Sequence, residues 1–395
     1  MNKKRRFKIV IGFIVILINN LTVEGGSFVK TFGGKEWDEA RSISKTGDGG
    51  YIVAGWTYSF GAGYYDFLVI RLDSKGNIKW AKTFGGEYLD YASSIRETLD
   101  GGYIVAGWTY SFGAGYYDFL VIRLDSKGNI KWAKTFGGGF EDKAHSIYET
   151  ADGGYIVAGH TNSFGKGNYD LLVIKLNSNG DIEWSKTFGG ENNDYAYSIY
   201  HTTDGGYIVA GHTNSFGKGD YDFLVIKLNS NGDIEWTKTF GSGSNEYGYS
   251  ICQTADGGYI VGGTSEPLFF EGAIKFLVIK LSSDGSVEWA KKFGIGESKN
   301  YAYSIQETGD DGYIIAGKTN FSWAGGYDFL VIKIQKSQMT HCYPWYDVNI
   351  AVNSPEISLS SPSISITKAD LITTTPAISS KSSKIQVSNV CIRRK

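Results

Sequence analysis

The chain has 395 residues, of which 42% are hydrophobic and 15% aromatic, enough for a sizeable core and too apolar for a disordered chain. Its formal net charge is −2, so no excess of basic residues points to nucleic acid as a partner. Glycine is abundant at 53 residues and proline scarce at 5, which favours many short strands joined by tight turns.

The first 26 residues differ in composition from the rest of the chain. A basic stretch, MNKKRRFK, precedes the apolar run IVIGFIVILI, which is too short to span a bilayer comfortably. Residues 1–26 are therefore predicted to be an export signal, and an uncleaved membrane anchor is the alternative. The signal predicts a secreted or cell-surface protein with no stable membrane span once it is removed.

Residues 27–335 are built from a repeat of about 50 residues. Successive tryptophans mark the repeat: Trp80, Trp132, Trp184 and Trp236 lie 52 residues apart, and Trp289 follows after 53. Each unit has four apolar runs of strand length. DGG and the DSKG or NSNG tetrads are tight hairpin turns, whereas SFGAGYYD and GGEYLDYA are longer loops. Successive connections of an antiparallel meander fall on opposite edges, so all the long loops are expected on one face, here called the long-loop face.

The number of strands predicts the fold. SFVKTF supplies one strand, five full units supply four each, and the last unit supplies three and ends at FLVIKI (329–334), which makes 24 strands. We predict an all-β, six-bladed β-propeller of four-stranded antiparallel blades over residues 27–335. The first strand is expected to pair with the open edge of the last unit and close the ring, with Phe28 in the place of the repeated tryptophan.

Two resemblances support this fold. LVIRLDSKGNIKWAKTFGG (68–86) and its relatives resemble the tryptophan-docking repeat of quinoprotein-like propellers, although the turn is about one residue shorter here. No set of residues matches a site for pyrroloquinoline quinone and its calcium. Over residues 27–335 the chain also resembles uncharacterised secreted prokaryotic proteins built from DGGYIVAG…DFLVIKL…WAKTFGG repeats. That resemblance implies export and a propeller, without an established activity.

Carboxylates recur in the long loops, just before the strand that reads AxSI. They are Asp38, Asp90, Asp142, Asp194 and Glu246. If that strand is innermost, these side chains ring the mouth of a central channel and could bind a hard cation such as Ca²⁺. The alternative, which we favour, is that each carboxylate caps its own loop by accepting backbone N–H groups. No other cofactor is predicted.

A second recurring position follows the glycine of YIVAG and varies between units. The candidate ligand-binding residues there are Trp56, Trp108, His160, His212 and Lys318, with Thr264 in the fifth unit. Aromatic rings at these places could stack on sugars, and the two histidines could bind a metal. The histidines belong to separate units, however, so the favoured interpretation is that they have no ligand. A third recurring feature, the Tyr-Asp pair typified by Tyr65 and Asp66, is interpreted as structural.

The sequence predicts no catalytic residues. It contains no HExxH, no GxxxxGK[ST] and no GxSxG motif. Residues 51–86 and 103–138 are identical, whereas a single active site needs different residues in different roles, so repetition favours multivalent binding. Only the later units diverge, with SEPLFFEGAIK (265–275) in the fifth, and Phe269 and Phe270 are its candidate partner contacts.

Residues 336–395 form a tail rich in Ser and Thr, which predicts either an extended surface stalk or a small β-rich appendage. Cys342 and Cys391 bracket this tail and could pair in an oxidising compartment. The most favoured function is an exported, non-catalytic binding or structural scaffold at the cell surface, with a surface glycan or a protein as its partner. A carbohydrate-binding protein that uses the long-loop face is the first alternative. A hydrolase or a quinoprotein-like oxidoreductase is the second.

Overall fold

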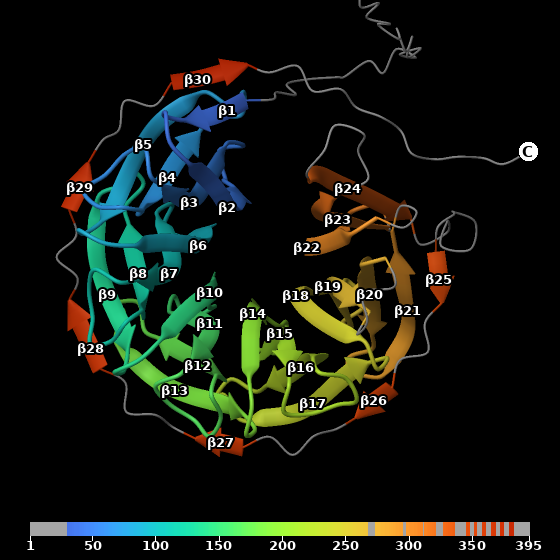
Figure 1. The fold of residues 1–395 in the computed structure, drawn as a ribbon. Coiled ribbons are helices and arrows are strands. Elements are labelled where there is room, and N and C mark those ends of the chain that lie inside the picture. The colour runs from blue at the N-terminus through green and yellow to red at the C-terminus, as the bar shows by residue number, and fades with distance from the viewer. Residues whose placement is uncertain are drawn as a thin grey trace, which may run out of the picture.

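The computed structural model describes residues 30–267, 273–294, 298–310, 312–320 and 327–335, together with six short strands between 345 and 382. Every element assigned in these residues is a β-strand, and the sheets radiate around a ring (Figure 1). The chain is therefore an all-β propeller with six blades, as the strand number predicts. The described part contains no helix of the length and apolarity needed to cross a membrane. The predicted signal, 1–26, lies outside the described residues.

Five blades have four antiparallel strands each, ordered from the centre of the ring to its rim, and the sixth has three (Figure 1). The first blade comprises β2 (Asp38–Lys45), β3 (Tyr51–Thr57), β4 (Asp66–Leu72) and β5 (Ile78–Gly85). The second comprises β6 (Asp90–Glu97), β7 (Tyr103–Thr109), β8 (Asp118–Leu124) and β9 (Ile130–Gly137). The third comprises β10 (Asp142–Glu149), β11 (Tyr155–Thr161), β12 (Asp170–Leu176) and β13 (Ile182–Gly189). The fourth comprises β14 (Asp194–His201), β15 (Tyr207–Thr213), β16 (Asp222–Leu228) and β17 (Ile234–Gly241). The fifth comprises β18 (Asn245–Gln253), β19 (Tyr259–Glu266), β20 (Lys275–Leu281) and β21 (Val287–Phe293). The sixth comprises β22 (Asn300–Thr308), β23 (Gly312–Thr319) and β24 (Asp328–Gln335).

The hydrophobic core lies between blades rather than inside one sheet. The cluster between the first two blades joins Phe67 and Val69 of β4 to Ile95 of β6 and Leu120 of β8, all of them buried. Strands such as β8 and β12 are buried along their whole length because a blade covers each of their faces. The apolar runs that predicted face-to-face stacking therefore occupy the seams between blades.

The repeated tryptophan spans each seam near the rim. The Trp80 ring of β5 lies against the hairpin turn of the next blade, and its Nε1–H donates to the Ser126 carbonyl oxygen at 3.3 Å. Gly128 in that turn has a φ of +76°, and a Cβ added to it would lie 2.9 Å from the Trp80 ring. Glycine is needed at this point both for the left-handed turn and for the close approach of the ring.

Among the described residues β1 (Lys30–Gly33) and β24 are not paired, which corrects the predicted closure of the ring. β1 hydrogen-bonds to β30 (Ser379–Ser382), and in the described residues β24 pairs with β23 alone. Phe32 packs on the first blade, and Lys30 Nζ donates to Asn77 Oδ1 at 2.8 Å. Through these two contacts β1 takes the place of an outer strand beside the first blade. The last blade, β22–β24, lies on the other side of an opening in the ring (Figure 1). Phe28 lies outside the described residues.

The tail runs backwards around the rim and adds an outer strand to each sheet that it meets (Figure 1). Its strands are β25 (Trp345–Asp347), β26 (Ala351–Asn353), β27 (Ser358–Ser360), β28 (Ser365–Lys368), β29 (Ile372–Thr374) and β30. They pair in turn with β21, β17, β13, β9, β5 and β1, all antiparallel. The tail covers blade edges that would otherwise expose unpaired backbone groups. Cys342 and Cys391 lie outside the described residues.

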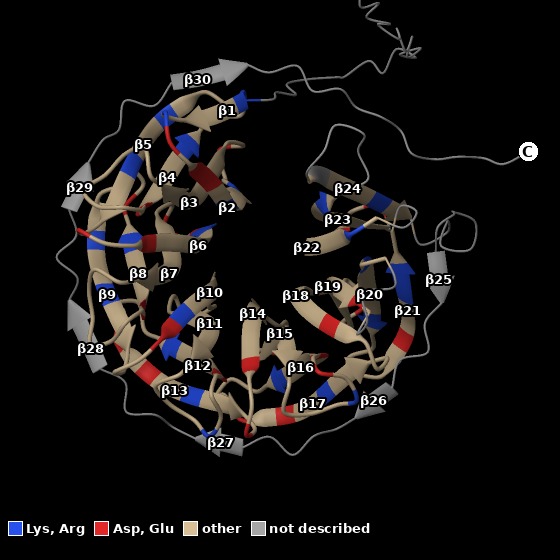
Figure 2. Cartoon of the chain, viewed as in Figure 1, with Lys and Arg blue, Asp and Glu red and all other residues tan. Residues whose placement is uncertain are grey.

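Charged residues of both signs are spread around the ring (Figure 2). Outer-strand lysines reach the hairpin turn of the next blade: Lys134 Nζ lies 2.7 Å from Asp181 Oδ1, and Lys186 Nζ lies 2.6 Å from Asp233 Oδ1. The carboxylate partners are exposed, so each pair is worth roughly 0–1 kcal/mol. These ion pairs supplement the apolar seams, which hold neighbouring blades together.

Candidate functional site

The recurring loop carboxylates lie beneath their own loops. Asp90 is fully buried, and its Oδ2 accepts the Gly86 N–H and the Ser111 hydroxyl proton, both at 2.8 Å. The same pattern recurs at Asp38, Asp142 and Asp194, and Glu246 Oε2 accepts the Ser242 N–H at 3.1 Å. Each carboxylate therefore ties the loop that enters its blade to the next long loop of that blade. In the described part of the chain, no three Asp, Glu, His or Cys side chains gather in a metal-binding group.

In the first four blades the Asp of the Tyr-Asp pair faces one of these carboxylates across a seam. Asp66 is 1% exposed, its Oδ2 accepts the Ala62 N–H at 2.8 Å, and its Oδ1 has no hydrogen-bond partner among the described residues. Burial, together with the neighbouring Asp90 carboxylate, raises the pKa of Asp66 to about 6. Asp118 and Asp142 repeat this arrangement. In the fifth blade Lys275 stands at the corresponding place and faces Asn300.

The residues that follow YIVAG face tyrosine rings more than solvent. Trp56 is 9% exposed and meets Tyr65 and Tyr91 edge-on, at centroid distances of 4.8 and 5.5 Å. His160 and His212 are each 5% exposed and lie in the same kind of box, made by the tyrosine of their own Tyr-Asp pair and a tyrosine of the next blade. Trp108 stacks on Tyr91 at 4.1 Å and is partly exposed. Lys318 Nζ lies 4.8 Å from the Tyr301 and Tyr327 ring centres.

The sequence reasoning missed the tyrosines of the innermost strands. Those on either side of the small residue in the motif DYAYSI and its counterparts are Tyr91, Tyr195, Tyr197, Tyr247, Tyr249, Tyr301 and Tyr303. The alternation in DYAYSI was the available signal, because the small residue between the two tyrosines is buried and the tyrosines must point to the opposite side. His145 continues this row: its ring stacks on Tyr197 at 4.7 Å, and its Nε2 lies 3.0 Å from His160 Nδ1. Burial and the neighbouring His160 keep the pKa of His145 well below its usual value.

The fifth-blade candidates are only partly described. Phe269 and Phe270 lie outside the described residues. Glu266 ends β19 with a partly exposed side chain, and burial raises the pKa of its carboxyl.

The exposed aromatic side chains of the long-loop face lie elsewhere. Trp37 before β2 and Tyr327 before β24 are exposed, and six more, Tyr58, Tyr64, Tyr88, Tyr110, Tyr116 and Phe140, are together named the tyrosine ridge. Each of these six lies in a loop that follows β3, β5, β7 or β9. The signal in the sequence was the change from YSFGAGYY in the first two units to NSFGKGNY in the third.

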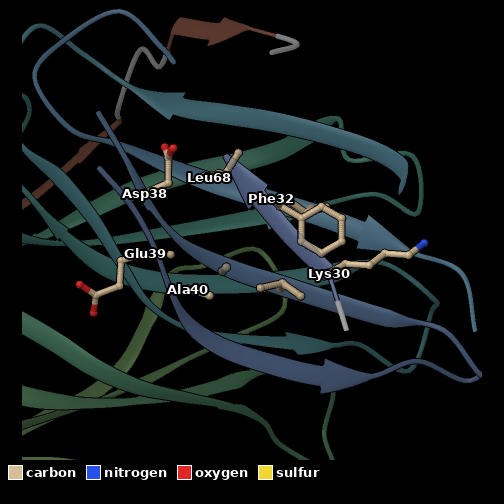
Figure 3. A pocket seen from close by; sticks show the side chains of 10 residues that line it. Lys30, Phe32, Asp38, Glu39, Ala40 and Leu68 are labelled. Carbon is tan, nitrogen blue, oxygen red and sulfur yellow. The ribbon is translucent and has the colours of Figure 1, made fainter. Parts of the chain in front are cut away.

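A pocket of about 160 Å³ lies on the open side of the first blade (Figure 3). Phe32, Asp38, Glu39, Ala40 and Leu68 are among the residues that line it. Gly55 also lines the pocket, and its counterpart in the second blade is Gly107. In the seam between these blades Phe67 covers Gly107, and a Cβ added to Gly107 would lie 2.8 Å from the Phe67 Cζ. The pocket is thus the part of the first blade that a preceding blade covers in every other seam.

Comparison with known proteins agrees with this architecture. The family model described as "Domain of unknown function (DUF5122) beta-propeller" matches residues 46–78, 99–130, 150–183 and 202–235. The chain is a β-propeller repeat protein. The four matched segments all begin at or beside the DGG turn and end at the first or second residue of an outer strand, so the family match and the blades follow the same repeat.

The relatives of this propeller protein are distant. It is 26% identical over 188 residues to the regulatory protein FlaEY of Caulobacter vibrioides, which covers 44% of this chain and 19% of that protein. It is 25% identical over 248 residues to an uncharacterized protein of Aquifex aeolicus, which covers 58% of this chain and 65% of that protein. The matches thus span less than two thirds of both relatives. An endo-arabinase from Bacteroides thetaiotaomicron shares 12% identity at a TM-score of 0.32, with 60% of this chain and 91% of that chain covered. A similarity at that level says nothing about activity.

Proposed function

We propose that this propeller protein is an exported, non-catalytic binding scaffold at the cell surface, and that it binds its ligand on the long-loop face. The observation that carries the proposal is the tyrosine ridge, because exposed aromatic side chains gathered on one face are typical of interaction surfaces. The ring supports these loops on rigid strands. The basic and apolar sequence of residues 1–26 supports export.

A binding role fits the recurring carboxylates better than catalysis does. General acid–base catalysis needs a carboxyl within hydrogen-bond reach of the substrate. Asp90, Asp142 and Asp194 are fully buried, and each accepts hydrogen bonds from a loop N–H and a loop hydroxyl group. The first two blades also carry identical loops, which repeat one surface instead of building one asymmetric site.

The experiment measures binding and turnover together. The exported full chain is mixed with cell envelopes of the organism that produces it, bound protein is quantified over a range of concentrations, and released products are sought by mass spectrometry. Saturable binding without release of products is expected. Absence of saturable binding contradicts the scaffold, and time-dependent release of products favours the hydrolase instead. Mass spectrometry of the N-terminus of the exported chain tests removal of residues 1–26.

Carbohydrate binding is the second candidate, and the burial of its first candidate residues moves it to a different part of the face. Trp56, His160 and His212 are covered by tyrosine rings, so replacing them is expected to disturb packing before it disturbs ligand contacts. The exposed tyrosines are the side chains that a sugar could reach from solvent.

A further inference from the structure

The tyrosine ridge is continuous across neighbouring blades. In the first blade the rings of Tyr58 and Tyr64 are parallel within 3°, with centroids 6.4 Å apart. In the second blade the ring centroid of Tyr110 lies 5.4 Å from that of Tyr88 and 6.3 Å from that of Tyr116. The two groups adjoin because Gly63, next to Tyr64, packs against the backbone around Tyr88. Gly115, next to Tyr116, packs in the same way against the backbone of Phe140.

The rings of the ridge keep large free surfaces. Tyr64 is 60% exposed and Tyr116 is 64% exposed. Burying such rings on binding is favourable, because each aromatic side chain buries ~150–250 Å² when it is fully covered.

Folding does not require tyrosine at these positions, as the chain itself shows. Asn162, Asn168 and Asn192 stand in the third and fourth blades where the second blade has Tyr110, Tyr116 and Tyr88. The loop hydrogen bonds are the same in both versions: the N–H of Tyr88 and the N–H of Asn192 each donate to a serine Oγ at 3.0 Å. The loops therefore keep their structure without these tyrosines, and ligand contact is a role that the exposed rings are free to fill.

The chemistry of the ridge points to a neutral, repeating ligand. Its two main loops, 57–65 and 109–117, contain no charged residue, so they specify no ionic partner. Beside Tyr88 and Phe140 lie the carboxylates Glu87 and Glu141, which disfavour an anionic ligand. Tyrosine offers an apolar face to the C–H side of a sugar ring and a hydroxyl to its oxygens. The two loops are identical and occur on successive blades, so they present the same subsite twice and suit a polymer of similar units.

We infer that the tyrosine ridge binds a neutral polysaccharide, with Tyr64 and Tyr116 as equivalent stacking platforms on the first and second blades. This inference rests on the proposed binding role of the long-loop face and adds to it the ligand class and the part of the face that is used. The amide-bearing loops of the third and fourth blades lie outside this site.

The test is affinity electrophoresis of the full chain in gels that contain soluble glucans, mannans, galactans or xylans, with polygalacturonate as the anionic comparison. Retardation in at least one neutral polysaccharide is expected. Tyr64→Ala combined with Tyr116→Ala should weaken binding at least tenfold, and each single substitution should weaken it less. Asn168→Ala combined with Asp220→Ala is the matched control at the same two loop positions of the third and fourth blades, and it should leave binding unchanged. Because the substituted side chains are exposed, thermal unfolding should show both double variants folded.

Two further readouts identify the interaction. Tyr64→Phe combined with Tyr116→Phe should keep most of the affinity if stacking dominates, and affinity should not change between 50 and 500 mM salt for a neutral ligand, because salt screens only charge–charge attraction. The inference is overturned if no neutral polysaccharide retards the protein, if both alanine double variants bind equally, or if binding requires polygalacturonate. If cell envelopes bind the protein and the tyrosine variants bind them equally well, the scaffold stands and the ridge as its site fails.

Discussion

Pairs of buried carboxyl groups that face each other between neighbouring blades make the stability of the folded chain depend on pH. Asp118 has a folded-state pKa of about 6, raised by burial above the ordinary 3.8. The folded chain therefore holds this proton more tightly than the unfolded chain does, and the stability that the proton provides is complete below about pH 4 and lost as pH rises through 6.

We predict that Asp118→Asn stabilises the protein at pH 8 and not at pH 4. The amide oxygen can still accept the Ala114 and Gly115 N–H groups, and the amide –NH₂ carries no charge against Asp142. The gain at pH 8 is expected to be ~1–3 kcal/mol, measured as the change in thermal unfolding midpoint of variant and wild type at each pH. Asp125→Asn serves as the control, because the pKa of this turn carboxyl is lowered and its effect should not grow between pH 4 and 8. A pH-independent Asp118→Asn effect would contradict the prediction.

The pair His145 and His160 makes stability depend on pH in the opposite direction. The pKa values of His145 and His160 are both lowered, mainly by burial, with Lys143 adding to the effect. The unfolded chain then binds protons that the folded chain excludes, so stability is complete above about pH 6.5 and falls as the solution is acidified.

We predict that His145→Tyr reduces this acid sensitivity. Tyrosine occupies the same position in the next three blades, as Tyr197, Tyr249 and Tyr303, so the inner row accepts it. Between pH 7.5 and 5.5 the unfolding midpoint of the variant should fall less than that of wild type. The carboxyl effects are common to both proteins and cancel in the difference. An equal or larger fall in the variant would show that His145 is not the group responsible.

At the scale of elements, the tail has a period that the sequence reasoning did not notice. β26, β27, β28, β29 and β30 start at residues 351, 358, 365, 372 and 379, seven residues apart, and an Ile or Leu precedes each start. The four strands of each blade were predictable because their apolar runs are long and repeat every 50 residues. Three-residue strands carry too little periodicity of their own, and their pairing depends on edges supplied by blades that are distant in sequence.

The seven-residue period predicts how the tail tolerates deletions. Removing the seven residues 362–368 should move every later strand by one blade, so that β9 and β5 keep an outer partner and β1 loses one. Removing only residues 362–364 should shift β28, β29 and β30 away from their partner strands. The outer strands β9, β5 and β1 should then all lose their partners. Amide hydrogen exchange along these three outer strands measures the difference. The same exchange pattern in both deletions would contradict pairing of one heptad with each blade.

At the scale of the whole molecule, sequence predicted the number and kind of blades but not how the ring ends. The spare first strand is of the outer type, and β1 does pack against the first blade as an outer strand. Its hydrogen-bond partner was mispredicted because strand counting treats every edge as equivalent. The short tail strand β30 was not among the candidates for pairing, yet it is the strand that pairs with β1. The site was harder to predict, because burial decides which of many similar aromatics face solvent.

The opening in the ring makes a direct prediction for equivalent isoleucines. Ile43 of β2 is 59% exposed, whereas its counterpart in the next blade, Ile95 of β6, is fully buried in the first seam. Ile95→Ala should therefore cost ~2–5 kcal/mol, because it removes buried methylene groups and leaves a cavity. Ile43→Ala should cost under ~1 kcal/mol, as expected for an exposed position. Thermal unfolding of the two variants gives the comparison, with Ile147→Ala as a second buried control. Equal losses at residues 43 and 95 would mean that another surface covers the first blade in solution and that the ring is not open there.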